Sequence, residues 1–204
     1  MIHSVIVPGV GGSEDSHWQT WLQQQLKPSS RVQQQHWQRP VLNDWVEAWA
    51  THVAHVAGSV QVIAHSFGCL TSVAALHKYP QLQSKVKNLV LVAPANPARF
   101  GENGFARESF TDYEQYFKSL RFTVPSHLLL SENDPWFALN DALDLAQHWQ
   151  IQPIVLGAVG HINVASGFNT FPAIVPYLLP ERKRLNWHLP AFNRFKSSDS
   201  AYFA

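Results

Sequence analysis

The sequence predicts an α/β fold, with a doubly wound, mostly parallel sheet of six strands and helices on both faces. Short apolar runs rich in β-branched residues alternate with longer stretches of helical periodicity along the chain, which is the pattern of repeated βα units. Most of these runs are almost continuously apolar, as parallel strands buried on both faces are. A length of 204 residues suffices for one hydrophobic core.

Six short runs qualify as strands. One of them, Val32–His36, is polar and is therefore expected at an edge of the sheet. The six predicted strands are Ser4–Val7, Val32–His36, Val60–Ala64, Asn88–Ala93, His127–Ser131 and Pro153–Leu156.

Helices are predicted where apolar residues recur every three or four positions. The clearest is Asn43–Ala57, in which Trp45, Trp49 and Val53 share one face and Gly58 follows as a stop signal. A second helix should begin at Phe67, directly after a strand, and end before a proline. The remaining predictions are Asn140–Gln150 and Thr170–Leu179, the latter with Pro176 in its interior.

Two segments stand apart from the βα pattern. Asn96–Pro125 contains no strand and is expected to form a loop and then a helix, which makes it a candidate lid. From Pro180 onward the residues are basic, aromatic and polar, and they cannot bury enough apolar surface to order themselves. We therefore expect a domain over residues 1–180 and a mobile or surface-laid tail over 181–204.

The composition excludes several classes of function. The formal net charge is +1, from 15 Lys and Arg against 14 Asp and Glu, so a nucleic-acid partner is not expected. No apolar run approaches the ~18 residues of a membrane span, and no targeting leader is visible. The single Cys69 excludes an intramolecular disulfide. We expect a soluble cytoplasmic protein without a membrane partner.

One motif carries chemistry. Ala64-His65-Ser66-Phe67-Gly68 follows a buried strand and opens a helix, as the nucleophile elbow G-x-S-x-G does, with Ala in place of the first Gly. Such a turn pushes the serine hydroxyl out above the strand ends, and small flanking residues avoid collisions with the neighbouring elements. The alternative role of Ser66 is that of a helix N-cap. His65 is expected to pack or to form a hydrogen bond at the strand end.

A serine nucleophile requires a base and an orienting carboxylate, which in this class follow in the order Ser, acid, His. Asp134 follows the fifth predicted strand and His161 follows the sixth, so both lie at the sheet edge where α/β proteins build their sites. Glu132 and Asp141 are nearby carboxylates, but we assign them to a strand end and to a helix. The sequence therefore predicts the catalytic residues Ser66, Asp134 and His161.

Further site residues follow from the same geometry. The oxyanion requires two N–H donors, which we assign to Phe67, after the nucleophile, and to Val10, in the glycine-rich loop after the first strand. Trp136 and Phe137 follow the acid and are candidates for lining the substrate pocket, as are Gly9 and Gly11, whose backbone a ligand can approach closely.

No cofactor or metal is predicted. His52 and His55 lie three apart on one helix, but no third ligand has a matching spacing. Cys69 follows the elbow on the buried side of its helix and is expected to pack inertly.

From about His3 to Leu179 the chain resembles the α/β-hydrolases, and within them the small YdeN-type family that includes retinoblastoma-binding serine hydrolases. The resemblance implies a compact hydrolase with a Ser–His–Asp triad, little or no cap, and a small ester or amide substrate. The departure is Ala64, where the family usually has Gly. The segments that carry the resemblance are VPGVGGSEDSHWQTW, QHWQRPVLNDWVEAW, AHSFGC, SENDPW and GAVGH.

A second hypothesis is that the chain is a protein-interaction module that has the same fold but is non-catalytic or only weakly catalytic. The Ala at residue 64 and the basic tail favour it, although the sequence indicates no particular protein partner. A complete triad on separate loops argues against it, because a scaffold does not need all three groups. Between the two, we expect a serine hydrolase of the esterase type.

Overall fold

The computed structural model describes residues 2–100 and 112–179. Its centre is one sheet of six strands, all parallel, in the order β2-β1-β3-β4-β5-β6. This confirms the predicted α/β class and number of strands. The strands are β1 His3–Val7, β2 Ser29–Arg31, β3 Val60–Ser66, β4 Val86–Pro94, β5 Ser126–Leu130 and β6 Pro153–Val155.

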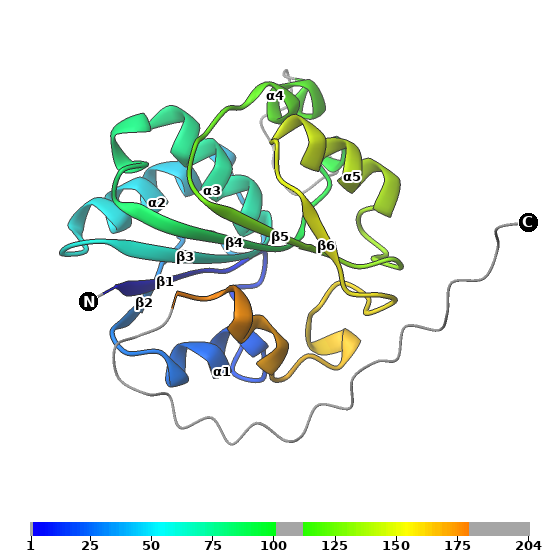
Figure 1. The fold of residues 1–204 in the computed structure, drawn as a ribbon, viewed down its shortest axis with the longest axis horizontal. Coiled ribbons are helices and arrows are strands. Elements are labelled where there is room, and N and C mark those ends of the chain that lie inside the picture. Colours follow the sequence, from blue (N-terminus) through cyan, green and yellow to red (C-terminus); the bar gives the residue numbers. More distant parts are fainter. Residues whose placement is uncertain (1, 101–111, 180–204) are drawn as a thin grey trace, which may run out of the picture.

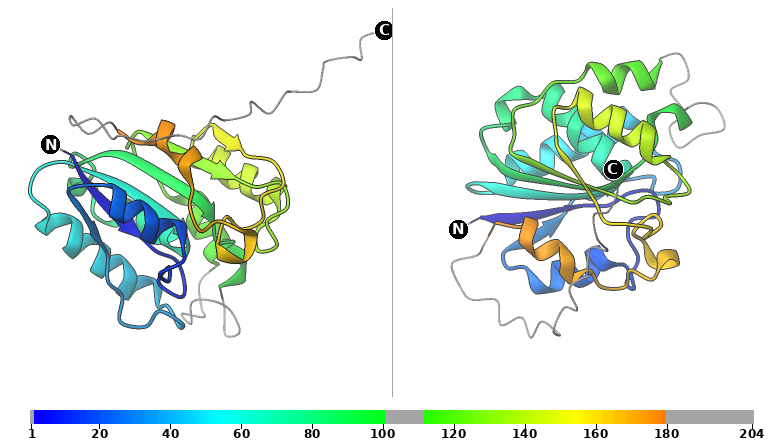
Figure 2. Two further views of the ribbon diagram at one scale, coloured as in Figure 1. Left: turned by 90° about the horizontal axis from the view of Figure 1, so that it is seen from below. Right: turned by 45° about the vertical axis from the view of Figure 1, so that its right-hand side comes forward.

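Helices cover both faces of the sheet, as Figure 1 shows. On one face lie α2 Leu42–His55, α3 Phe67–Lys78, α4 Tyr113–Ser119 and α5 Leu139–His148. On the other lie α1 Trp18–Gln25 and the 3₁₀ helix η4 Pro172–Tyr177, which run close together in the views of Figure 2. Shorter 3₁₀ turns are η1 Pro80–Leu82, η2 Pro97–Arg99 and η3 Val164–Ser166.

The strand residues alternate between two hydrophobic cores. In β3, Val62 and Ala64 belong to the core under α2 and α3, whereas Ile63 belongs to the core under α1 and η4. Neighbouring strands repeat this alternation in register, because successive side chains of a strand point to opposite faces. Burial on both faces explains why these strands appear as continuous apolar runs in the sequence.

The second strand was predicted in the wrong place. The edge strand is Ser29–Arg31, which pairs with β1, and Val32–His36 lies after it. The side chains of β2 are held by specific hydrogen bonds instead of apolar burial. The Ser30 hydroxyl bonds His3 and His52, and Arg31 donates to carbonyl groups of the loop after β1. A strand of this kind leaves no hydrophobic signal.

One helical prediction needs correction, and one helix was missed. Thr170–Leu179 contains the short 3₁₀ helix η4 in place of an α-helix, because Pro176 in its interior lacks the amide hydrogen that an α-helical ladder uses. The helix α1 was not predicted, because its glutamine-rich residues give only a weak apolar stripe.

The other helices agree with their predicted positions within a few residues. The helix predicted within Asn96–Pro125 is present as α4. The predicted lid loop falls largely on residues 101–111, and the tail predicted over 181–204 lies, like them, outside the described residues. In the part of the chain that is described, no helix has the length and apolar character needed to cross a membrane.

Candidate active site

The turn between β3 and α3 has the conformation of a nucleophile elbow. Ser66 is the last residue of β3 and the N-cap of α3, with φ 54° and ψ −123°. A non-glycine residue is rarely found with such a φ, and the strain persists only where surrounding structure fixes it. Its hydroxyl makes no side-chain cap bond to the helix, so the N-cap alternative does not explain this residue.

Gly68 shows why a small residue must follow the serine. A Cβ at this position would lie 2.4 Å from the carbonyl oxygen of Val7 and 2.6 Å from that of Pro8. The first turn of α3 therefore packs directly against the backbone at the end of β1. No side chain fits between them without a shift of the backbone.

Ala64 occupies the other flank without disturbing the strand. It is fully buried in the core below α2 and α3, and it pairs in register with Val7 and Leu91. The positive φ of the elbow falls on Ser66 and not on residue 64. An alanine methyl group is therefore compatible with this elbow.

Ser66, His161 and Asp134 form one chain of hydrogen bonds. The Ser66 Oγ lies 2.9 Å from His161 Nε2, and His161 Nδ1 lies 2.7 Å from Asp134 Oδ2. Because a carboxylate only accepts, Nδ1 carries the proton and Nε2 accepts from the serine hydroxyl. The His161 and Asp134 side chains are only 8% and 5% exposed, so water competes little for these bonds.

Asp134 is held in place by its second oxygen. Its Oδ1 accepts the backbone N–H of Trp136 at 2.8 Å, which fixes the carboxylate while Oδ2 faces the imidazole. The two other carboxylates considered as the acid do not take this position. Glu132 is exposed, and Asp141 lies on α5 beside a different cavity.

The loop that carries His161 is tied to the loop that carries Asp134. The Asn133 side-chain oxygen accepts the amide of Gly160 at 2.7 Å, and the Ser131 hydroxyl accepts the amide of Val159 at 3.1 Å. On the other side, the His161 amide donates to the Ser166 hydroxyl at 3.1 Å. Sequence reasoning missed these supports, because they act on backbone atoms of a loop whose path the sequence does not reveal.

A cavity of about 210 Å³ opens beside the serine. Ser66 and His161 line it together with both expected oxyanion donors, Val10 and Phe67. Phe67 is the first residue of α3, so its N–H has no partner within the helix.

The lining of this cavity also includes Trp136, as expected, and three residues that the sequence reasoning missed: Ala95, Asn96 and Asn163. The first two directly follow β4, and their place at the active edge of the sheet was the available signal.

Three tentative pocket residues do not line this cavity. Phe137, a candidate pocket residue, is buried in the hydrophobic core under α5 and is not among the residues that line the cavity beside Ser66. Gly11 forms a turn in which its amide donates to the Trp37 carbonyl at 3.0 Å. Gly9 packs against the elbow itself. The two glycines shape the loop that presents Val10.

Cys69 does not compete with Ser66 as a nucleophile. It is fully buried, and burial raises the pKa of its thiol far above the ordinary value, because a thiolate would be desolvated there. Its Sγ lies 3.4 Å from the Val92 carbonyl oxygen. The residue packs as expected.

Within the described residues, no group of three His, Cys, Asp or Glu side chains is arranged to hold a metal ion. His52 bonds the Ser30 hydroxyl, and His55 bonds the Thr51 carbonyl of its own helix. A larger cavity of about 560 Å³ lies between the segment after β2 and α2, remote in sequence from the triad loops. The site is therefore identified by its chemistry and not by the size of the cavity.

The chain is similar to a known family and to several solved structures. A family model described as Serine hydrolase matches residues 4–179. No curated protein sequence matches the chain. Among solved structures, a YdeN-like hydrolase from Pectobacterium atrosepticum is similar with 28% identity and a TM-score of 0.71, over 87% of this chain and 90% of that one.

More distant structures share the fold. The ydeN gene product of B. subtilis has a TM-score of 0.65 at 17% identity, over 86% of this chain and 96% of that one. Est1E from Butyrivibrio proteoclasticus, solved with ferulic acid bound, has a TM-score of 0.60 at 13% identity, over 87% and 89%. Because the family model spans nearly all of the described chain, this protein belongs to the serine hydrolase family, with the YdeN-type α/β-hydrolase fold.

Proposed function

We propose that this protein cleaves a carboxylic ester of a small substrate through an acyl-enzyme intermediate on Ser66. The observation that carries the proposal is the hydrogen-bonded chain from Ser66 Oγ through His161 to Asp134. A serine hydroxyl is a weak nucleophile at neutral pH and becomes effective when a base is poised to take its proton. The chain of hydrogen bonds supplies that base.

In the first half-reaction, Ser66 Oγ attacks the carbonyl carbon while His161 Nε2 takes the hydroxyl proton. Asp134 accepts the hydrogen bond from Nδ1 and stabilises the imidazolium that forms. The N–H groups of Val10 and Phe67 would bind the oxyanion, since both residues line the cavity beside Ser66. Collapse of the tetrahedral intermediate expels the alcohol, which takes the proton from His161 Nε2.

In the second half-reaction, water replaces the alcohol. His161 Nε2 removes a proton from the water as its oxygen attacks the acyl carbon, and the same proton then returns to the Ser66 oxygen when the acid is released. No group other than the triad and the oxyanion donors is needed for the proton balance. The three side chains that move the proton are already hydrogen-bonded to one another.

The volume of about 210 Å³ favours a small substrate, because ligand sites for larger molecules begin at about 300 Å³. Cleavage of an amide is the competing activity, since His161 could equally protonate a leaving amine. A panel of matched ester and amide substrates with identical acyl groups distinguishes the two by their kcat/KM values.

Replacement of the nucleophile tests the proposal. We expect Ser66→Ala to abolish both labelling by a fluorophosphonate probe and hydrolysis of p-nitrophenyl acetate, while circular dichroism stays unchanged. The control is Ser72→Ala, on the same helix, whose hydroxyl donates to the Gly68 carbonyl. Labelling of Ser66→Ala at the level of the parent chain would refute the assignment, and an unlabelled parent would favour the interaction-module alternative.

A further inference from the structure

The loop that carries His161 turns its backbone carbonyls toward buried side chains. Gly160 and Ile162, on either side of His161, have φ values of 64° and 50°, so the chain bends sharply around the imidazole. Ile162 is fully buried. Buried carbonyl groups require hydrogen-bond donors, and a loop has no ladder to supply them.

Two side chains from other elements supply these donors. His65 Nε2 lies 3.0 Å from the carbonyl oxygen of His161, and the Trp18 indole Nε1–H donates to the carbonyl oxygen of Ile162 at 2.8 Å. Trp18 begins α1, on the face of the sheet where the segment after His161 also lies (Figure 2). The backbone amide of Trp18 also donates to the Phe168 carbonyl. The base loop is therefore anchored at two successive carbonyls.

The two anchors also support each other. The Trp18 and His65 rings meet edge to face with centroids 5.8 Å apart, and the His65 and His161 rings lie 5.0 Å apart. Since a carbonyl only accepts, His65 must carry its proton on Nε2. Burial lowers the pKa of His65 well below its ordinary value, and a charge on His161 or His17 would oppose its protonation further. His65 thus remains a neutral donor while His161 gains and loses its proton.

We propose that His65, with Trp18, is a positioning residue for the base of the proposed hydrolase reaction. The two N–H groups hold the His161 and Ile162 carbonyls, and thereby fix the imidazole with Nε2 toward Ser66 and Nδ1 toward Asp134. Neither side chain needs to touch the substrate. The inference rests on the proposed function, and it assigns a role to the histidine beside the nucleophile.

The test combines kinetics with a spectroscopic readout in the full chain. His65→Leu removes the donor, His65→Gln keeps an N–H near the position of Nε2, and Trp18→Phe keeps the aromatic packing but loses the indole N–H. For p-nitrophenyl acetate, we expect His65→Leu and Trp18→Phe to lower kcat about 10- to 100-fold with KM nearly unchanged. His65→Gln should recover at least half of that loss on a logarithmic scale.

The spectroscopic readout is the downfield proton resonance of the N–H between His161 Nδ1 and Asp134. It should be sharp in the parent chain and in His65→Gln, and broadened by exchange in His65→Leu and Trp18→Phe well below their melting temperatures. A residue that only stabilises the fold would leave this resonance intact in the folded state.

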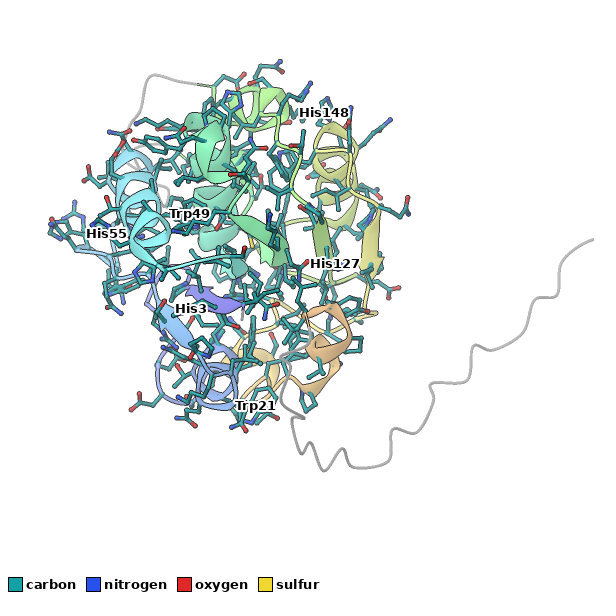
Figure 3. All side chains as sticks on the ribbon, turned by 60° about the vertical axis from the view of Figure 1, so that its left-hand side comes forward. His3, Trp21, Trp49, His55, His127 and His148 are labelled. Carbon is teal, nitrogen blue, oxygen red and sulfur yellow. The ribbon has the colours of Figure 1, made fainter. Side chains whose placement is uncertain are left out.

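Two matched controls remove the same groups elsewhere. Trp49→Phe deletes an indole on α2 (Figure 3), on the other face of the sheet, and its Nε1 has no hydrogen-bond partner among the residues that the structure describes. His127→Leu deletes an imidazole in β5, where it packs against Tyr177. Both controls should keep the parent kcat and resonance.

The inference is overturned if His65→Leu and Trp18→Phe retain the parent kcat, if the controls lose as much, or if His65→Gln behaves like His65→Leu. A parent chain without hydrolase activity would refute the proposed function instead. In that case the resonance still tests whether the two donors hold the imidazole.

Discussion

The loop after β1 lies against the nucleophile elbow through Gly9, where a Cβ would stand 2.7 Å from the Cβ of Ser66. The same Cβ would approach the His65 carbonyl oxygen and the Phe67 amide nitrogen at 3.1 and 3.3 Å. We therefore expect Gly9→Ala to displace the loop, and with it the neighbouring Val10 amide, from Ser66. The kcat/KM for p-nitrophenyl acetate should fall about 10- to 100-fold.

Gly58→Ala is the matched control for this prediction. Gly58 has a φ of 75°, but apart from its chain neighbours no described residue has a heavy atom within 4 Å of its Cβ position. Its substitution should cost about 1 kcal/mol of stability through backbone strain and leave kcat/KM unchanged. Parent-level activity in Gly9→Ala would show that the contact with Ser66 does not position the donor loop.

Asp134→Asn tests the orientation of the imidazole. The amide fills the same space, but an NH₂ group facing His161 Nδ1 favours the tautomer with the proton on Nε2, which can no longer accept from Ser66. We expect kcat to fall about 10²- to 10⁴-fold with little change in melting temperature. The control is Asp141→Asn, at an exposed position on α5, for which no loss is expected. Similar kcat values for the two variants would argue against the proposed role of Asp134.

The sequence was sufficient to predict the central strands of the sheet. β1, β3, β4 and β5 lie in two cores at once, so their residues are continuously apolar and stand out from the surrounding chain. β2 could not be recognised, because Ser30 and Arg31 are stabilised by partners distant in sequence. For α1, the decisive contacts are likewise tertiary, with Trp18 bonded to the Ile162 carbonyl.

In the candidate site, the residues that directly follow strands could be predicted, whereas those that depend on loop conformation could not. Ser66, Asp134 and His161 each follow a strand of a parallel sheet, and such positions converge at one edge whatever the loops do in detail. Pocket residues depend on where loop side chains point: Trp136 lines the cavity, whereas its neighbour Phe137 turns into the core. Asn163 and Ser166 form hydrogen bonds within the loop that follows His161. This loop is irregular, so the sequence has no periodic pattern from which its path could be predicted.

The different positions of Trp136 and Phe137 lead to opposite predictions. Trp136 is 44% exposed and lines the cavity, with the Arg99 guanidinium 4.4 Å above its ring. Trp136→Ala should raise KM for aryl esters several-fold with a small effect on stability. Phe137→Ala should cost about 3 kcal/mol of stability, because it leaves a hole in the core, while KM stays near that of the parent. Urea denaturation and steady-state kinetics measure the two effects separately, and the reverse pattern would contradict the assignment.

His17 makes the stability of the fold dependent on pH. The ring is buried and its Nδ1 accepts the amide of Gln19 at 3.1 Å. Burial, with the nearby charges of Arg31 and His161, lowers the pKa of His17 to about 4, and the His65 ring packs against it. In the unfolded chain the pKa is about 6.5, so between these values the unfolded state binds a proton that the folded state does not.

These two pKa values decide whether acid stabilises or destabilises the fold. Above pH 6.5 both states are neutral at this residue, and as the pH falls toward 4 the free energy of unfolding decreases, by about 2 kcal/mol at pH 5 from His17 alone. His65 contributes in the same direction, because its pKa is also lowered by burial.

His17→Asn tests this pH dependence, because it keeps an acceptor for the Gln19 amide but does not titrate. Urea denaturation at pH 5 and 7.5 should show a smaller difference in the free energy of unfolding than in the parent. His55→Asn, at an exposed position of α2, should leave the difference unchanged. If His17→Asn loses as much stability on acidification as the parent, the proton uptake belongs to another residue.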